Sequence, residues 1–338
     1  MLRGDVIGIV EAVYEIEGRD ESDWLRGIAQ LTAATVGDVS AGAYGLTYDA
    51  SDVAAFRASN PVMVGVVDPQ LERVFKIDCL GPYRKNPDLV EAVFRKIGYA
   101  PSTKLPLAEK LAQAHAKLRA RGVHEILGIN GVNVDGRSAH VGVFLNRPAS
   151  TLQTDVLARL ATHLGAAFRL RSRIGDTSPV DRADAILEPS GKVTHAVREA
   201  KIRSARAALS DAGAQLDRLR AAERRRDPER ALRAWRALID ARWSLVDHFE
   251  RDGRRYVLAQ RNEPDVGPIE LLSGRERQVV ALAALGHSNK MIGYELGIAV
   301  STVGVLLTRA CRRLGATSRR ELVAAYERHA KRESAGMP

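Results

Sequence analysis

The chain has 338 residues, 45% of them hydrophobic and 27% charged, which is typical of a globular protein and excludes a largely disordered one. That length gives room for two or three domains with cores of their own. Its two cysteines, Cys79 and Cys311, lack a Cys-x-x-Cys spacing, which excludes a disulfide scaffold and a zinc ribbon. Uncharged runs stay short of the ~20 residues of a membrane span, and the acidic N-terminus is unlike a secretory signal. We therefore expect a cytoplasmic protein without a membrane partner.

The net charge of +10 is confined to the C-terminal part of the chain. Residues 1–195 carry 23 basic and 23 acidic side chains, residues 196–261 carry 17 and 10, and residues 269–338 carry 11 and 6. This asymmetry favours a polyanionic partner at one end of the chain and a different task at the other. Arg-rich helices that are merely solvated would give the same count, so charge alone does not separate the two readings.

Residues 1–175 alternate helical and strand patterns. The spacing of apolar residues predicts a helix over 23–36, strands over 39–48 and 62–67, and a short helix over 88–97. Residues 125–146 read as a hairpin that turns at Asp135-Gly136, and an amphipathic helix follows over 153–174. This order resembles a GAF domain, a sensor fold related to PAS. The resemblance implies a small-molecule effector, a partner protein or a second copy as the binding partner.

Residues 183–262 form a second predicted module. A strand-turn-strand pattern over 185–195 opens it and a strand over 254–260 closes it. Between them we expect two helices, 196–226 and 228–249, with Trp235 and Trp243 in the core. The module resembles a PAS-like fold whose middle is helical. Residues 263–268, with two prolines and a glycine, are predicted to be a linker.

Residues 269–332 predict four short helices. Ser273 and Glu276 are placed as a capping box for the first, which ends at Gly286. The second helix is expected over 289–296, the third from Ser301 to about residue 314, and the fourth over 319–329. Two short helices joined by a tight turn, the second longer and basic toward its end, are the helix-turn-helix arrangement. Its second helix is narrow enough for the major groove of DNA.

The residues of this segment resemble the LuxR-type (GerE-type) DNA-binding domain over about 55 positions. The matching strings are Leu272-Ser273-x-Arg275-Glu276-Arg277-x-Val279, Gly286-x-Ser288-Asn289-Lys290-x-Ile292, Leu296-Gly297-Ile298, Ser301-Thr302-Val303, Leu314-Gly315 and Arg320-Glu321-Leu322. The resemblance implies double-stranded DNA as the partner, and a homodimer whose recognition helices enter successive major grooves.

The third helix departs from the family pattern. Where the family usually has a lysine, then a histidine and often a second basic residue, this chain has Gly304, Leu306 and Thr308. Leu306 and Leu307 are expected to pack inward. Gly304 costs roughly 1 kcal/mol of helix stability relative to alanine, unless it permits close approach to DNA.

We predict DNA contacts for exposed positions of the second and third helices: Ser288, Asn289, Lys290, Ser301, Thr302, Val305, Thr308, Arg309, Arg312 and Arg313. By resemblance, the fourth helix makes the dimer contact through Leu322, Val323 and Tyr326, with packing on its own domain as the alternative. We expect Arg275 and Glu276 to form an intradomain ion pair or cap.

Enzymatic and metal chemistry is not expected. His124-Glu125 begins like a zinc-protease motif, but Gly128 stands where the second histidine belongs. Asp68 is followed by proline and lacks the acidic partners of a phospho-receiver. Cys79 near Lys76 allows a GAF-type thiol reductase, yet no histidine or resolving cysteine lies near it in the sequence. We predict no cofactor and no metal.

These patterns together predict a multidomain α+β protein. It has a GAF-like antiparallel-sheet sensor domain (1–175), a PAS-like helical module (183–262), a linker (263–268) and an all-α four-helix LuxR-type domain (269–332). The predicted function is that of a dimeric transcriptional regulator, associated with the nucleoid when bound to DNA, whose sensor modulates promoter binding. The alternative is a signal-binding or partner-binding protein whose helix-turn-helix no longer reads DNA, as Gly304 and Leu306 allow.

Overall fold

The computed structural model describes residues 5–16, 19–36, 39–66, 68–96, 98–149, 154–173, 179–218, 238–239, 243–249, 255–262, 269 and 271–334. The chain begins with α1 (Val6–Tyr14) and α2 (Glu21–Thr35), followed by β1 (Val39–Asp49), η1 (Val53–Ala55), β2 (Arg57–Ala58) and β3 (Val62–Val64). A helical stretch follows with α3 (Pro69–Val74), η2 (Phe75–Cys79), α4 (Gly81–Lys85) and α5 (Pro87–Val93). It leads through β4 (Tyr99–Pro101), η3 (Ser102–Lys104), η4 (Ala108–Leu111) and α6 (Ala112–Arg119) to β5 (Glu125–Asn130), β6 (Arg137–Leu145) and α7 (Thr154–Ser172).

The strands of this part form a six-stranded sheet in the order β2-β1-β6-β5-β4, with β3 also paired to β1. The predicted hairpin is present, since β5 and β6 pair antiparallel from Glu125↔Leu145 to Asn130↔His140. Gly136 in the connecting turn has φ 78°, a backbone conformation that glycine adopts without a steric penalty. The predicted strand over 39–48 and the helices over 23–36 and 153–174 are confirmed within a few residues by β1, α2 and α7.

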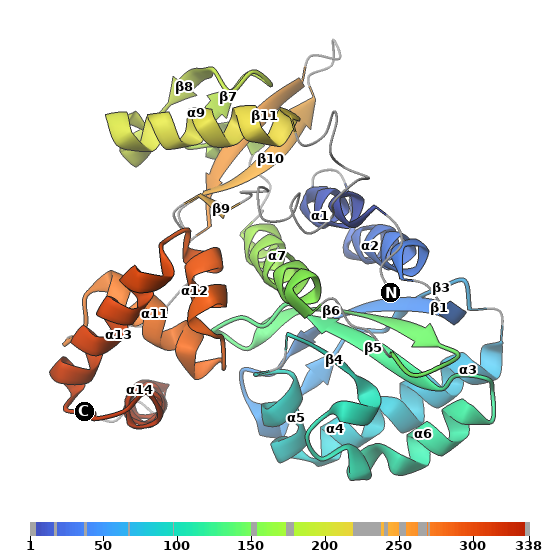
Figure 1. Ribbon diagram of the computed structural model, residues 1–338. Coiled ribbons are helices and arrows are strands. Elements are labelled where there is room, and N and C mark those ends of the chain that lie inside the picture. The colour runs from blue at the N-terminus through green and yellow to red at the C-terminus, as the bar shows by residue number, and fades with distance from the viewer. Residues whose placement is uncertain are drawn as a thin grey trace.

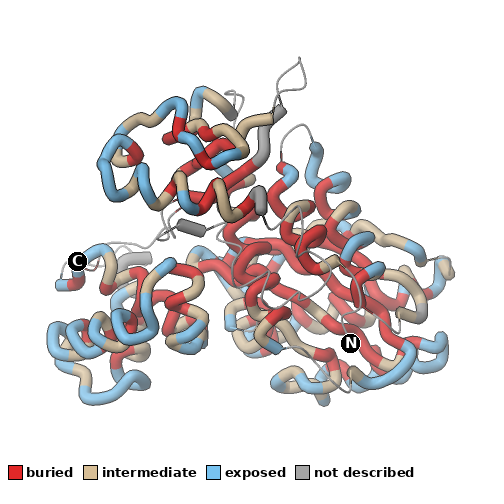
Figure 2. The backbone as a smooth tube through the Cα atoms, turned by 45° about the horizontal axis from the view of Figure 1, so that its top comes forward, coloured by how far each residue is buried: buried red, intermediate tan, exposed pale blue. Residues whose placement is uncertain are grey.

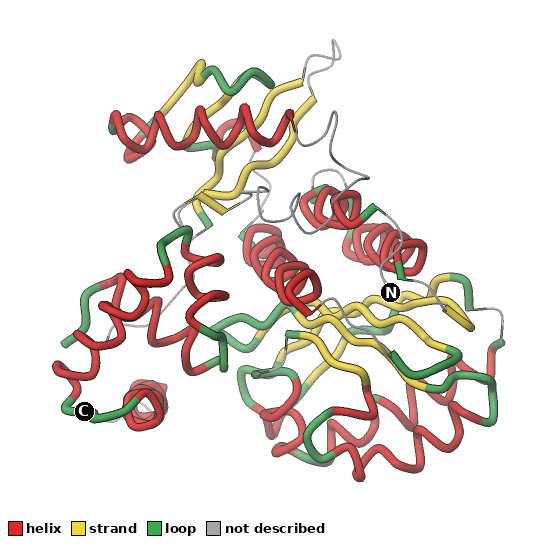
Figure 3. The backbone as a smooth tube through the Cα atoms, viewed as in Figure 1, coloured by secondary structure: helices red, strands yellow, loops and turns green. Residues whose placement is uncertain are grey.

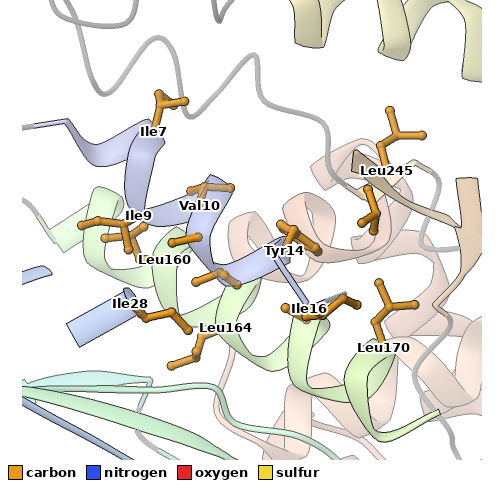
Figure 4. Packing of buried hydrophobic residues seen from close by; sticks show 14 of the residues in the cluster. Ile7, Ile9, Val10, Tyr14, Ile16, Ile28, Leu160, Leu164, Leu170 and Leu245 are labelled. Atoms are coloured by element: carbon orange, nitrogen blue, oxygen red, sulfur yellow. The ribbon is translucent and has the colours of Figure 1, made fainter. Parts of the chain in front are cut away.

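Helices cover both faces of the first sheet (Figure 1). On one face, α1, α2 and α7 pack on residues such as Val141 and Val143 of β6. On the other, α3 to α6 pack on Phe144 of the same strand and on Leu46 of β1. Successive side chains of a strand point to opposite faces, so the apolar end of β6, from Val141 to Leu145, supplies both layers. Figure 4 shows Ile9 and Val10 of α1 beside Leu160 and Leu164 of α7.

A second, five-stranded sheet has the order β8-β7-β11-β10-β9. Its strands are β7 (Ala185–Leu187), β8 (Val193–Ala196), β9 (Leu238–Ile239), β10 (Trp243–Phe249) and β11 (Arg255–Arg261), accompanied by α8 (Pro179–Arg182), η5 (Arg198–Lys201) and α9 (Arg203–Arg218). In each sheet, the strand that comes first along the chain lies between the second strand and the last strand. The last three strands along the chain lie next to one another across the sheet, in sequence order. The predicted hairpin over 185–195 and strand over 254–260 are confirmed.

The predicted helix over 228–249 is wrong for its described part. Residues 238–239 and 243–249 are strands, and β10 pairs with β11 from Trp243↔Arg261 to Phe249↔Arg255. The run Trp243 to Val246 is buried at every position, so its apolar residues carry no period that distinguishes a strand from a helix. The predicted helix over 196–226 begins later, at Arg203, after η5. Trp235, the rest of that segment and the linker 263–268 lie outside the described residues.

One hydrophobic cluster joins the two sheets. It contains Val10 and Leu170 from the helices of the first sheet together with Leu187, Trp243 and Val257 from the second. Figure 2 shows buried segments in both sheet-containing parts of the chain. The first 262 residues therefore share a core where their described parts meet.

The C-terminal part of the chain is helical (Figure 3). It consists of α11 (Gly274–Ala284), α12 (Asn289–Leu296), α13 (Val300–Leu314) and α14 (Arg319–Ser334), which pack around a cluster that includes Val279, Ile292 and Val303. Among the described residues, no single helix is long and apolar enough to cross a membrane. The helices α12 and α13 reach the length and composition of a membrane span only when taken together, and this pair is bent by 105°.

Candidate nucleic-acid interface

The start of α11 is fixed by the predicted capping box. The Ser273 Oγ accepts a hydrogen bond from the Glu276 backbone N–H at 3.3 Å, and the Ser273 N–H donates to the Glu276 carboxylate at 2.8 Å. Glu276 is 2% exposed and also pairs with Arg313 of α13 at 2.9 Å. Arg275 donates to the Gln278 side chain at 3.0 Å. The cap that we expected at Glu276 is present, and Glu276 forms its ion pair with Arg313.

A tight turn joins α12 to α13. Gly297 ends α12 with φ 63°, and the Ile298 N–H donates to the Gly293 carbonyl at 3.0 Å. A Cβ on Gly293 would lie 2.8 Å from the Ile298 carbonyl oxygen, so the turn can approach α12 only at a glycine. The 105° bend between the two helices falls in the range of helix-turn-helix units.

The two faces of α13 differ sharply in exposure. Val303, Leu307 and Ala310 are buried against α11 and α12, and Leu306 packs on the same cluster, as predicted. The opposite face is exposed and carries Ser301, Thr302, Val305, Thr308, Arg309 and Arg312. The spacing of these residues is that of one helical face. The sequence-predicted recognition residues of α13 are thus brought together on one side of the helix.

The predicted cations differ in how they are engaged. Within the described part of the chain, Arg309 and Arg312 make no ion pair, and both are exposed. Arg313 is held by Glu276, and Lys290 pairs with Asp155 of α7 at 2.5 Å. The geometry therefore leaves Arg309 and Arg312 available to an external anion, whereas Arg313 and Lys290 already have carboxylate partners.

The remaining predicted residues of α12 lie at its first turn. The Ser288 side chain caps the helix by accepting from the Met291 N–H at 3.3 Å. The side-chain Oδ1 of Asn289 accepts a hydrogen bond from Arg319 of α14 at 2.6 Å. These two contacts position the start of α12 and tie it to α14.

Gly304 faces open space on α13. A Cβ built there would meet nothing within 4 Å, and the Thr308 hydroxyl donates to the Gly304 carbonyl at 3.0 Å. The packing of the domain therefore does not require glycine at this position.

The residues predicted for a dimer contact lie in the domain's own core. Leu322 is 0% and Tyr326 is 8% exposed, and Val323 is partly buried against the same cluster. A contact between copies through α14 would use these side chains only at the expense of that packing. Their role in a dimer stays a prediction.

Sequence reasoning missed three residues of α7 that contact α12. Asp155 pairs with Lys290, His163 lies 2.7 Å from the Tyr294 hydroxyl, and Arg169 lies 3.4 Å from the Glu295 carboxylate. In the sequence these residues are ordinary members of an amphipathic helix. No local pattern could have indicated a partner more than 120 positions away.

A cavity lies between the first sheet and α3 to α6, with a space of about 60 Å³, room for about two water molecules. Its lining combines aromatic rings with a few polar groups and includes Tyr44, Phe75, Tyr83, Phe94, Asn130 and His140. His140 donates from Nδ1 to the side-chain Oδ1 of Asn130 and accepts at Nε2 from the Tyr44 hydroxyl at 2.9 Å. Burial lowers the pKa of His140 to about 3, so its ring is neutral at neutral pH.

Cys79 also lines this cavity. It lies at the end of η2, where burial and the nearby Asp78 raise the pKa of its thiol to about 12. A thiol that stays protonated is a poor nucleophile, which speaks against the thiol-reductase alternative. Among the described residues, no group of three histidine, cysteine or acidic side chains is placed to hold a metal ion.

The fold and exposed face of α13 define the C-terminal part as a helix-turn-helix domain of the DNA-binding class. Residues 270–325 match the family described as bacterial regulatory proteins, luxR family. The chain thus carries a luxR-family domain at its C-terminal end, and the sequence-based identification of that domain is confirmed.

No curated protein matches the chain. Among solved structures, the chain is similar to the crystal structure of Escherichia coli SdiA, with 10% identity, a TM-score of 0.31, and coverage of 92% of this chain and 91% of that one.

Proposed function

We propose that the protein is a DNA-binding transcriptional regulator whose α13 enters the major groove. The observation that carries this proposal is the exposed face of α13, where Arg309 and Arg312 have no intramolecular ion pair within the described residues, in a domain of the luxR family. In addition, the N-cap position Ala299 provides no side-chain hydrogen bond to the first amides of α13, which leaves them for a phosphate.

Binding of a random-sequence DNA duplex, measured by fluorescence anisotropy at 50 and 200 mM salt, tests this function. We expect affinity to fall steeply with salt, since neutralised phosphates release counterions. Arg309→Ala and Arg312→Ala should each weaken binding and reduce the slope of log affinity against log salt by about 1. Arg328→Ala, an exposed arginine of α14, is the control. Absence of binding at 50 mM salt would instead support the alternative, a partner-binding protein whose helix-turn-helix no longer reads DNA.

The proposed binding species is a homodimer. Two α13 helices would then occupy major grooves about 34 Å apart on an inverted repeat. Selection of bound sequences from a random DNA pool tests this arrangement, because a dimer enriches two half-sites with fixed spacing and a monomer enriches one.

We also propose the N-terminal sheet domain, which by sequence resembles a GAF domain, as the sensor. The cavity over Tyr44 and His140 favours a small, neutral, mostly apolar effector with one hydrogen-bonding group, because its walls are aromatic and the imidazole is uncharged. At about 60 Å³ it admits an organic molecule only if α3 to α6 move outward. Thermal shift measures this binding, with phenol and indole as probes. The wild-type protein is compared with an Ala114→Leu variant, whose larger side chain fills the space.

A further inference from the structure

A cavity larger than the one near Tyr44 lies between the N-terminal domain and the C-terminal helices, and we call it the interdomain cavity. Its space is about 430 Å³, within the ~300–1,000 Å³ typical of ligand sites. Residues 96 and 98–101 at β4, the first half of α7 and the start of α12 line it, and α7 and α12 lie side by side (Figure 1). Ala100 and Asn130 line both cavities, so β4 and the end of β5 separate them.

Short side chains leave this space open. The apolar lining combines small residues of β4 and α7 with one residue each from the β5–β6 loop and α12: Ala100, Pro101, Ala158, Ala161, Val132 and Met291. The backbones of the two domains meet at the same place, since a Cβ on Gly286 would lie 3.6 Å from the Lys96 carbonyl oxygen. Walls of this kind accommodate an aromatic ring or a short aliphatic chain.

Two lysines, one from each domain, are among the described residues that line the cavity. Lys96 pairs with Glu91 at 3.2 Å and Lys290 pairs with Asp155 at 2.5 Å, and the four side chains are between 42% and 61% exposed. Ion pairs this exposed are weak, so an anionic ligand can replace the internal carboxylate. Of these residues Lys96, Lys290 and Asp155 line the cavity, two positive charges against one negative. The lining therefore favours an anion.

Hydrogen-bond donors accompany the lysines. The lining includes the hydroxyl groups of Thr154, next to Asp155 in the chain, and of Ser288, the N-cap of α12. The first turn of α12, with Lys290, lies at the positive end of that helix's dipole and carries no acidic residue. These groups can donate to a carboxylate held at Lys290.

We propose that the interdomain cavity binds a small organic anion, a monocarboxylate with an apolar body. Its carboxylate replaces Asp155 as the partner of Lys290, Lys96 adds to the positive potential, and the apolar body lies against Ala100 and Ala158. The site is incomplete in either domain alone, because α12 supplies the pairing cation and the N-terminal domain supplies the apolar wall. The inference goes beyond the proposed function and does not depend on DNA binding.

Benzoate and its neutral counterpart benzamide are the probes, titrated into the full chain by ligand-observed NMR. We expect benzoate to saturate with a Kd in about the millimolar range, as for other ligands of this size, and benzamide to bind about tenfold more weakly. A benzamide affinity equal to that of benzoate would overturn the inference, because charge would then play no part.

Charge variants with opposite expected effects locate the carboxylate. Lys290→Met keeps an apolar stem but removes the cation, and it should weaken benzoate binding by about threefold to tenfold. Asp155→Asn removes the competing carboxylate and should tighten binding. The controls are Lys117→Met on α6, where Lys117 pairs with Asp78, and Asp88→Asn in the first turn of α5; neither position lines the cavity. If both test variants bind benzoate like their controls, the proposal is wrong.

A filling variant separates the two cavities. Ala158→Leu, in the interdomain cavity, should abolish benzoate binding, whereas Ala114→Leu, in the cavity near Tyr44, should leave it unchanged. Thermal unfolding confirms that both variants are folded, and the Lys290 and Asp155 variants decide the question if Ala158→Leu is not. Benzoate that fails to saturate the wild type, or that is displaced by Ala114→Leu instead, would refute the site. The duplex measurements that test the proposed function are unaffected by any of these results.

Discussion

The hydroxyl of Tyr44 on β1 lies 2.9 Å from Nε2 of His140 on β6, in a pair where neither side chain is more than 9% exposed. The rings are stacked, with centroids 5.5 Å apart. Tyr44 is further enclosed by Phe75, at a centroid distance of 4.0 Å, and by Phe144 at 5.4 Å. This buried aromatic group forms one wall of the cavity that we propose for the effector.

The first prediction is that acid destabilises the protein. Burial lowers the pKa of both His140 and His163 to about 3, below the ordinary value of about 6.5. Below pH 6.5 the unfolded chain takes up protons that the folded chain does not, so stability is fully present above pH 6.5 and is lost as the pH falls toward 3. Each histidine should contribute a loss of up to about 1.4 kcal/mol per pH unit in that range.

Urea unfolding at pH 7 and pH 5 measures this loss. His140→Gln should reduce the dependence on pH by about the share of one histidine, because glutamine does not titrate. His195→Gln, at an exposed position on β8, should leave it unchanged. Equal free energies of unfolding at the two pH values would contradict the prediction.

The second prediction concerns the glycine beneath Tyr44. A Cβ on Gly142 would lie 2.3 Å from the Tyr44 ring, closer than real Cβ contacts come. The surrounding rings prevent Tyr44 from moving aside, so Gly142→Ala should reduce the free energy of unfolding by about 1–3 kcal/mol, the usual range for overpacking. Gly81→Ala is the control, since its Cβ would meet nothing within 4 Å. If the two variants unfold at the same urea concentration, the ring is not held as described.

These contacts mark what the sequence could and could not predict. Turn and cap residues act locally, so the hairpin at Asp135-Gly136, the capping box at Ser273 and the end of the third helix at about residue 314 were predicted correctly. The strand β10 was not, because its run from Trp243 to Val246 is buried at every position and has no period that distinguishes a strand from a helix. The hydrogen bond between His163 and Tyr294 joins positions 131 residues apart, and no local sequence pattern predicts such a pair.

The third prediction separates the two neighbouring arginines at the end of α13. Arg313 pairs with the buried Glu276, whereas Arg312 is exposed and, among the described residues, has no ion-pair partner. Arg313→Ala should therefore reduce the stability of the domain, since it leaves the Glu276 carboxylate without its cation. Arg312→Ala should instead weaken duplex binding with little change in stability. Thermal unfolding and anisotropy on both variants check this, and the opposite assignment of the two effects would refute it.

The fourth prediction concerns the cap of α11. Ser273→Ala removes the side-chain acceptor for the Glu276 N–H and should reduce the free energy of unfolding by about 1 kcal/mol. Because Glu276 also holds Arg313, the loss should be larger in a Glu276→Gln variant, which weakens both contacts. Ser190→Ala is the control: Ser190 is exposed in the turn between β7 and β8, where it accepts from the Lys192 N–H at 3.4 Å but caps no helix. A Ser273→Ala variant as stable as this control would show that the capping box contributes nothing.

The last prediction concerns Gly304 on the exposed face of α13. Alanine at this position meets nothing within 4 Å and removes the conformational freedom that glycine gives the unfolded chain, so Gly304→Ala should raise the free energy of unfolding by about 1 kcal/mol. If glycine is there to let the DNA backbone or a base edge approach the helix, the same variant should bind duplex more weakly despite its greater stability. Gly274→Ala, at the first position of α11, is the control. A Cβ on Gly274 would have its nearest neighbour at 3.9 Å, so this variant also replaces a glycine without a clash but lies outside α13. A gain in stability with unchanged duplex affinity would mean that Gly304 has no role in DNA binding, and base readout would then fall to the neighbouring Ser301, Val305 and Thr308.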